Sequence, residues 1–125
     1  MILELLDKEY CIYKLDTKDK IDNRIIGDDF ISITKTEDEI SIVSVSGTLE
    51  HFEEKEDTWK ILKISGILDF GLIGIISKIS TILADQGISI FVISTYNTDY
   101  IMVKKDTLEK TIKILEQNNY EIKKK

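Results

Sequence analysis

Residues 68–74, Leu-Asp-Phe-Gly-Leu-Ile-Gly, are the part of this chain whose residue types and spacing best suit the binding of a small molecule. They precede a helical pattern, and the first N–H groups of a helix lack partners within that helix. Gly71 and Gly74 have no side chains to block an approach to the N–H groups of Leu72 and Ile73. Such a turn can hold a small anion, although the same spacing also suits a tight turn or close helix packing.

The residues around this turn predict an alternation of strands and helices. Apolar side chains recur at the spacing of one helical face at Leu72, Ile75, Ile76, Ile79 and Leu83. The predicted elements are strand, helix, strand, strand, helix and strand, at residues 59–64, 72–86, 88–94, 100–103, 106–118 and 120–122. Asp106, followed by Glu109, is the predicted N-cap of the second helix. This order is that of the ferredoxin-like fold, an α+β sandwich with two helices on one face of an antiparallel sheet.

Residues 1–58 carry strand patterns and little helical pattern. Three strands are predicted there, at residues 10–15, 30–34 and 40–45. A short, weakly helical stretch ends at Ile26, and Thr36 and Glu39 have the capping-box spacing of a single helical turn. A polar link over residues 46–58 follows, so the boundary between two units is predicted near residue 58.

The two halves of the chain are similar to each other. Residues 31–43 match residues 91–103 at an offset of sixty positions, with strand on strand and turn on turn. This match indicates a tandem pair of related units, in which the first copy is reduced and its helices are short or missing.

Residues 68–100, which end in Ile-Ser-Thr-Tyr-Asn-Thr-Asp-Tyr, resemble ACT domains, the small regulatory modules of aspartokinases and of the CASTOR-type arginine sensors. The resemblance covers residues 59–123 well and residues 9–46 more loosely. It implies two ferredoxin-like units packed side by side, a reduced ACT-like unit at residues 1–58 and an ACT domain at residues 59–125. It also implies a non-catalytic regulatory or sensor protein that binds a free amino acid where such units meet, within one chain or across a homodimer.

The resemblance also implies a ligand site. In amino-acid-binding ACT domains, a carboxylate at the position of Asp69 commonly holds the ligand's ammonium group. The predicted ligand-binding residues lie in this loop and at the neighbouring strand end: Asp69, Phe70, Gly71, Leu72, Ile73, Gly74, Ser94 and Thr95. Helix capping explains Asp69 equally well, because an aspartate near a helix start accepts N–H bonds whatever the function. Phe70 also suits a core or an interface, and residues 97–99 also suit an ordinary hairpin turn.

Composition argues against two kinds of partner. The 125-residue chain has a net charge of -6 and a single arginine, whereas nucleic-acid binding depends on many basic side chains. No segment approaches the roughly 20 apolar residues of a membrane-spanning helix. The N-terminal residues lack the pattern of a signal peptide, so a cytoplasmic protein without nucleic-acid or membrane contact is expected.

Few side chains in this sequence suit catalysis or metal binding. His51 is the only histidine and lies in a charged stretch, where solvent exposure is expected. Cys11 is the only cysteine and lies in an apolar strand pattern, where buried packing is expected. One histidine and one cysteine are too few for a typical zinc site. We therefore predict no catalytic residue, no metal site and no cofactor.

Two other functions fit parts of the sequence. A structural module that binds another protein, without a small ligand, fits the apolar first half that lacks helical cover. A small ferredoxin-like hydrolase would need an anion-binding arginine in the loop, where the sequence has Asp69 instead. The sequence does not define which amino acid binds, which protein is regulated or how many copies of the chain associate.

Overall fold

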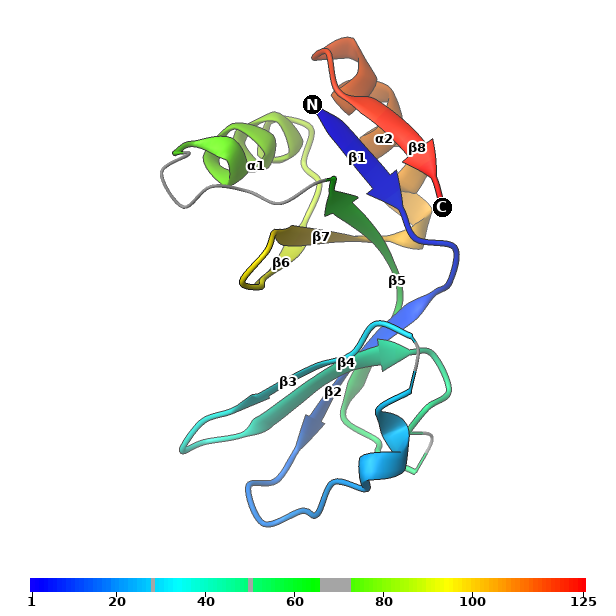
Figure 1. Ribbon diagram of the computed structural model, residues 1–125, viewed down its shortest axis with the longest axis vertical. Helices are drawn as coiled ribbons and strands as arrows, with labels where there is room; N and C mark the ends of the chain where they lie inside the picture. The colour runs from blue at the N-terminus through cyan, green and yellow to red at the C-terminus, as the bar shows by residue number, and fades with distance from the viewer. Residues whose placement is uncertain (28, 50, 66–72) are drawn as a thin grey trace. The chain divides into compact units, whose positions relative to one another are not determined.

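The computed structural model describes residues 1–27, 29–49, 51–65 and 73–125 (Figure 1). The chain forms two compact units, the helical unit, residues 1–7 and 59–125, and the strand unit, residues 8–58. The sequence pattern had left residues 1–7 in the first unit, and the structure corrects this assignment. They belong to the helical unit because they form a strand that pairs with its sheet.

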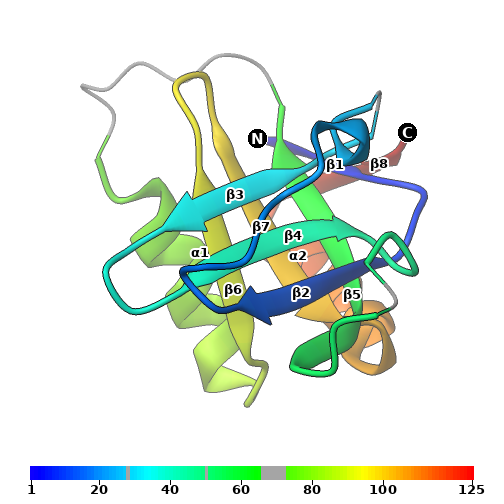
Figure 2. The same cartoon turned by 90° about the horizontal axis from the view of Figure 1, so that it is seen from below.

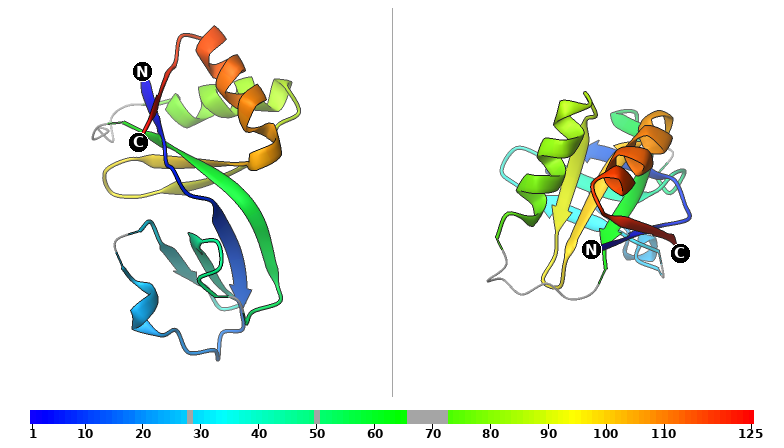
Figure 3. Two further views of the ribbon diagram at one scale, coloured as in Figure 1. Left: turned by 90° about the vertical axis from the view of Figure 1, so that its right-hand side faces the viewer. Right: turned by 90° about the horizontal axis from the view of Figure 1, so that it is seen from above.

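The sheet of the helical unit has the strand order β6–β7–β5–β1–β8. Its strands are β1 (Ile2–Leu5), β5 (Lys55–Ile64, in this unit from Trp59 on), β6 (Ile90–Ser94), β7 (Asp99–Lys104) and β8 (Glu121–Lys124). Its helices are α1 (Ile75–Asp85), the short 3-10 helix η2 (Lys105–Thr107) and α2 (Leu108–Gln117). Both α-helices lie on the same face of the sheet (Figure 3). The predicted α+β, ferredoxin-like arrangement is therefore confirmed.

Strand β1 was not predicted from the sequence. It lies between β5 and β8, antiparallel to β5, with Leu3 opposite Ile64, and parallel to β8, with Ile2 opposite Glu121. Compared with the predicted antiparallel sheet, the observed sheet therefore has one more strand and one parallel pair. A four-residue strand is stable only through its neighbours, and here both neighbours are distant in sequence.

The apolar faces predicted for the two helices are buried against the sheet. Ile79 and Leu83 of α1 and Leu115 of α2 are fully buried, and each contributes about 1.5–3 kcal/mol through removal of its side chain from water. The core of the unit consists of buried side chains from helices and strands: Leu3, Leu5, Leu62, Ile64, Ile79, Leu83, Ile88, Ile101, Val103, Leu115 and Tyr120. Leu72, predicted on the same helical face, lies outside the described residues.

Helix α2 begins later than its predicted cap. Asp106 lies within η2, and the N-cap of α2 is Thr107, whose side chain does not cap the helix. The Thr107 hydroxyl donates instead to the carbonyl of Lys104 at 2.9 Å. The chain thus makes a 3-10 turn first, which moves the helix start past Asp106, and the predicted N-cap is wrong.

In the strand unit, three neighbouring strands pair in the order β3–β4–β2 (Figure 2). Its strands are β2 (Tyr10–Leu15), β3 (Ser32–Lys35) and β4 (Ile40–Val45), and its short 3-10 helix is η1 (Asn23–Ile25). The strands predicted at residues 10–15 and 40–45 are confirmed in full, and the strand predicted at residues 30–34 is observed slightly later. The 3-10 helix η1 falls within the predicted weakly helical stretch.

The core of the strand unit is covered by short segments. Its buried side chains are Cys11, Tyr13, Leu15, Ile40, Ile42 and Leu49. Ile25 of η1 and Phe52 pack against this core. Leu49 and Phe52 come from the stretch predicted to be a polar link, and the Leu49 N–H donates to the Tyr13 hydroxyl at 3.4 Å. Cys11 is buried, as predicted. Single apolar residues in turns thus cover this sheet where the other unit has α-helices.

The hairpins β3–β4 and β6–β7 have loops with the same hydrogen bonds. The Thr36 N–H donates to the Glu39 carbonyl at 2.9 Å, and the Thr95 N–H donates to the Thr98 carbonyl at 2.8 Å. The Thr36 hydroxyl also accepts from the Glu39 N–H at 3.1 Å, as the Thr95 hydroxyl does from the Thr98 N–H at 3.3 Å. The first loop is thus a bend fixed by a threonine, and the predicted helical turn is wrong.

The strand pairing also corrects the offset between the two hairpins. Lys35 pairs with Ile40, and Ser94 pairs with Asp99, so each loop has the same length. Equivalent positions are therefore 59 residues apart, whereas the sequence match used sixty. The difference of one residue matters because side chains on a strand alternate between the two faces of the sheet.

Candidate functional site

Helix α1 begins at a glycine in a left-handed conformation. Gly74 is the N-cap, with φ 82° and ψ 2°, and its carbonyl accepts the first helical bond from the Lys78 N–H at 2.9 Å. Among the described residues, nothing lies within 4 Å of where a Cβ on Gly74 would be, so the left-handed backbone conformation is what favours glycine here. Because glycine has no side chain to cap the helix, the first N–H groups of α1 depend on other partners.

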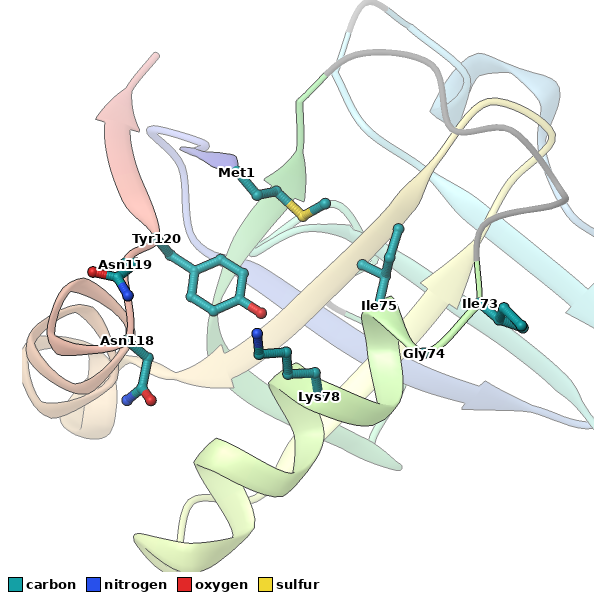
Figure 4. Close-up of a pocket in the computed structure, with 8 residues that line it drawn as sticks. All are labelled: Met1, Ile73, Gly74, Ile75, Lys78, Asn118, Asn119 and Tyr120. Atoms are coloured by element: carbon teal, nitrogen blue, oxygen red, sulfur yellow. The ribbon is translucent and has the colours of Figure 1, made fainter.

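The predicted loop residues are only partly within the described structure. Asp69, Phe70, Gly71 and Leu72 lie outside the described residues. Ile73, the residue before the N-cap, is 93% exposed, which is unusual for a large apolar side chain. Its side chain points away from the body of the unit (Figure 4).

The other predicted site residues lie at the β6–β7 hairpin loop. Ser94 is the last residue of β6, and Thr95 opens the loop; both are exposed. Thr98, the last residue of the loop, is 3% exposed, and its hydroxyl donates to the carbonyl of Ile64 at 2.8 Å. Ile64 is the last residue of β5, so this bond holds the loop beside the end of that strand. From the sequence alone, Thr98 is predicted only as a turn residue.

A cavity of about 380 Å³ opens beside the start of α1 (Figure 4). Its described walls come from the start of α1, the end of α2 and the first residue of the chain: Met1, Ile73, Gly74, Ile75, Lys78, Asn118, Asn119 and Tyr120. The cavity therefore includes two of the predicted site residues, Ile73 and Gly74. It also includes polar residues that the sequence analysis did not single out.

Lys78 and Tyr120 dominate the chemistry of this cavity. The Lys78 ammonium and the Tyr120 hydroxyl point toward one another (Figure 4). Within the described part of the chain, neither group has a hydrogen-bond or ion-pair partner. Burial raises the pKa of Tyr120 above its usual value near 10, so its hydroxyl is protonated at neutral pH. Forty-two positions separate the two residues, and no local pattern connects them.

The described residues contain no group of three or more metal-ligating side chains. His51 is exposed, as predicted, and its ring lies 4.2 Å from the Phe52 ring between centroids. Among the helices that the structure describes, none is long and apolar enough to cross a membrane.

Comparison with known proteins defines the family of this chain. The ACT domain family model matches residues 54–117, about half of the chain, and a second model, for an N-terminal domain, matches residues 8–49. The chain therefore belongs to the ACT domain family. Its division into two units parallels these two matches.

Two similar proteins illustrate this relationship. The putative protein CASTOR3P of Homo sapiens is 37% identical over 92 residues, which cover 63% of this chain and 56% of the human protein. The chain thus spans about half the length of this curated relative. Protein Atu0741 of Agrobacterium tumefaciens is 31% identical, with a TM-score of 0.91 over 99% of this chain and 92% of that one.

A more distant structure shares the fold. The ligand-free regulatory subunit of aspartate kinase from Thermus thermophilus is 11% identical, with a TM-score of 0.59 over 88% of this chain and 92% of that one. The resemblance to ACT domains that the sequence predicts is thus confirmed.

Proposed function

We propose that this ACT protein is a non-catalytic regulatory protein that binds a free amino acid at the start of α1. The observation that carries the proposal is the geometry of that helix start. Gly74 leaves the first turn of α1 without a side-chain cap, and the cavity opens beside it. The positive end of a helix dipole with unpaired N–H groups suits a ligand carboxylate.

The hairpin loop supplies a second side of the proposed site. Thr98 fixes this loop, which carries Ser94 and Thr95, to Ile64 at the end of β5. Asp69 would hold the ligand's ammonium group, and Phe70 would pack against its side chain. Gly71, Leu72, Ile73 and Gly74 would present backbone to its carboxylate.

Relatives support a regulatory role without defining the ligand. The Thermus thermophilus protein of the same fold is a regulatory subunit of aspartate kinase. By analogy, this chain would transmit the binding of an amino acid to a protein that it regulates. We propose a cytoplasmic homodimer, in which pairing buries exposed apolar groups.

A thermal-shift panel of the twenty amino acids tests the proposal. A ligand at a hundred times its dissociation constant stabilises the folded state by about 2.7 kcal/mol, which is readily detected. We expect one amino acid, or a few related ones, to raise the melting temperature. No shift with any of the twenty would contradict the proposal.

Asp69→Asn then tests the assigned role of the carboxylate. The substitution keeps an oxygen that can cap N–H groups but removes the charge that attracts an ammonium group. We expect calorimetric titration to show about a ten- to hundredfold loss of affinity, with a change in unfolding free energy well under ~1 kcal/mol. Asp106→Asn, an exposed aspartate of η2, is the matched control and should bind normally. Equal affinity of the Asp69 variant and the wild type would remove Asp69 from the site.

A structural interaction module without a small ligand is the second candidate. It is favoured by the exposure of two large apolar side chains, Ile73 at 93% and Tyr96 at 83%. Such side chains are common at protein interfaces. Light scattering discriminates further, because a mass of 14.4 kDa at all concentrations would contradict the proposed homodimer. A dimer combined with no thermal shift would favour the interaction module.

A further inference from the structure

The cavity beside α1 combines two polar donors with an apolar wall. The Lys78 ammonium and the Tyr120 hydroxyl point toward one another, and the side chains of Met1 and Ile75 lie beside them (Figure 4). None of the eight described lining residues is acidic. The volume of about 380 Å³ lies at the small end of the range for ligand pockets, which suits a single small metabolite.

Tyr120 provides the observation that points to a ligand. Its side chain is 9% exposed and belongs to the core of the helical unit, yet its hydroxyl reaches the cavity. Within the described residues this hydroxyl has no hydrogen-bond partner, so it is available to a molecule in the cavity. Burial also raises its pKa, so at neutral pH the group is a donor and not an anion.

Two converging donors, one of them charged, call for an acceptor that carries negative charge. A carboxylate has two oxygens, and can accept from an ammonium and from a hydroxyl at the same time. The start of α1 at Gly74 and Ile75 adds the favourable end of the helix dipole on the same side of the cavity. Met1 and Ile75 would face the uncharged part of the ligand.

We propose that this cavity binds the carboxylate of a small aliphatic molecule, with Lys78 as its charged partner and Tyr120 as its hydroxyl donor. This inference deepens and rests on the proposed function, because it names the side chains that receive the carboxylate of the amino acid. It makes Lys78 and Tyr120 ligand-binding residues beside the start of α1.

Three probe molecules separate the groups of the ligand in calorimetric titrations of the full chain. L-leucine has both an ammonium and a carboxylate, 4-methylpentanoate has only the carboxylate, and leucinamide has only the ammonium. We expect L-leucine and 4-methylpentanoate to bind. Leucinamide should bind at least about tenfold more weakly, since it offers no anion to Lys78.

Matched variants then test the two side chains. Lys78→Gln should weaken the binding of both carboxylates about five- to thirtyfold, whereas Lys78→Arg should retain most of it. Tyr120→Phe should weaken binding about fivefold and leave the circular dichroism spectrum unchanged, because only the hydroxyl is lost. Lys113→Gln removes an exposed lysine of α2 outside the cavity and should change nothing.

The outcomes distinguish this inference from the proposed function. Equal binding of leucinamide, unchanged affinity in Lys78→Gln, or no binding of any probe up to about 10 mM would overturn the inference. An amino acid from the panel whose affinity is unaffected by Lys78→Gln would overturn it while leaving the proposed function intact. Binding of 4-methylpentanoate that depends on Lys78, without binding of any amino acid, would support the inference and contradict the proposed function.

Discussion

The hairpins β3–β4 and β6–β7 share one loop design but differ in what holds the loop in place. In both, a threonine at the first loop position bonds the fourth residue through its N–H and its hydroxyl. The fourth residue is Glu39 in the first hairpin and Thr98 in the second. Only the second is buried, with its hydroxyl bound to the carbonyl of Ile64.

This comparison separates scaffold from site. The hydrogen bonds of the threonine give both loops the same shape. They do so in the strand unit, whose sheet is covered by turns, and in the helical unit, whose sheet is covered by α-helices. The bond from Thr98 adds a fixed position beside the end of β5. The hairpin that carries the candidate site residues is therefore the one that is tied to the rest of its unit.

The largest expected effect compares the two kinds of core cover. Leu83→Ala removes a fully buried side chain from α1 and should lower the free energy of unfolding by about 2.7–5 kcal/mol. Leu49→Ala removes a buried side chain from a turn and should cost less, because a turn collapses more readily onto the cavity. Urea denaturation measures both losses, followed by the fluorescence of Trp59 for Leu83→Ala and by circular dichroism for Leu49→Ala. An equal or larger loss for Leu49→Ala would show that turns cover a sheet as rigidly as helices.

Thr98→Val tests the bond that distinguishes the two hairpins. The variant keeps the shape of the side chain but leaves the Ile64 carbonyl without this donor, so a loss of about 1–3 kcal/mol is expected in urea denaturation. Glu39→Gln changes the equivalent, partly exposed position of the first hairpin and should alter stability by less than about 0.5 kcal/mol. Similar losses for both variants would break the comparison.

Thr36→Ala and Thr95→Ala test the feature that the hairpins share. Each substitution removes a hydroxyl that accepts a loop N–H, so each should cost about 0.5–1.5 kcal/mol. Because the bonds match, the two losses should agree within about 0.5 kcal/mol when measured by the same denaturation assay. Thr34→Ala, an exposed threonine of β3, is the control for a general effect on strands. A loss of stability in only one of the two variants would show that the loops have the same hydrogen bonds but that these bonds contribute differently to stability.

The smallest effect concerns the buried thiol of the strand unit. Burial raises the pKa of Cys11 above its usual value near 9, so the folded state holds this proton more tightly than the unfolded state does. The contribution of this thiol to the free energy of unfolding is fully present below pH 9 and is lost as the pH rises through the folded-state pKa. We expect a decrease of about 1 kcal/mol or less between pH 8 and pH 10, and a flatter profile for Cys11→Ala. An unchanged profile in the variant would assign the pH dependence to other groups, such as Tyr13.

Local patterns sufficed for most elements of the fold. Strand β2 begins and ends where its alternating pattern does, and β4 where its run of β-branched residues does. The apolar period of α1 identified its buried face. Strand β1 was missed because four residues carry little pattern, and its stability comes from β5 and β8. The predicted cap at Asp106 failed because a 3-10 turn and an α-helix start with similar sequences.

The candidate site was only partly predictable. Glycine spacing identified Gly74 as a turn at a helix start, since a positive φ favours that residue type. The roles of Thr98 and Tyr120 depend on partners and neighbours brought together by the fold, and nothing in the residues beside them indicates those contacts. In the sequence, Lys78 is an ordinary lysine on the polar face of a helix. Its proposed role depends on the fold, in which α2 and β8 position Tyr120 opposite it.

The position of β1 makes the strand unit an insertion within the helical unit. Asp7 and Trp59, on either side of the insertion, are held close, because the Leu6 N–H donates to the Ile61 carbonyl at 3.0 Å and the Lys60 ammonium donates to the Asp7 carbonyl at 3.1 Å. During synthesis, β1 must wait for both of its partners, and β8 is made after the other described strands of the unit. The strand unit can therefore fold first. Its first and last residues then lie close together, which brings β1 toward β5. A chain in which a short hairpin turn replaces residues 8–58 would retain every strand pair of the helical unit.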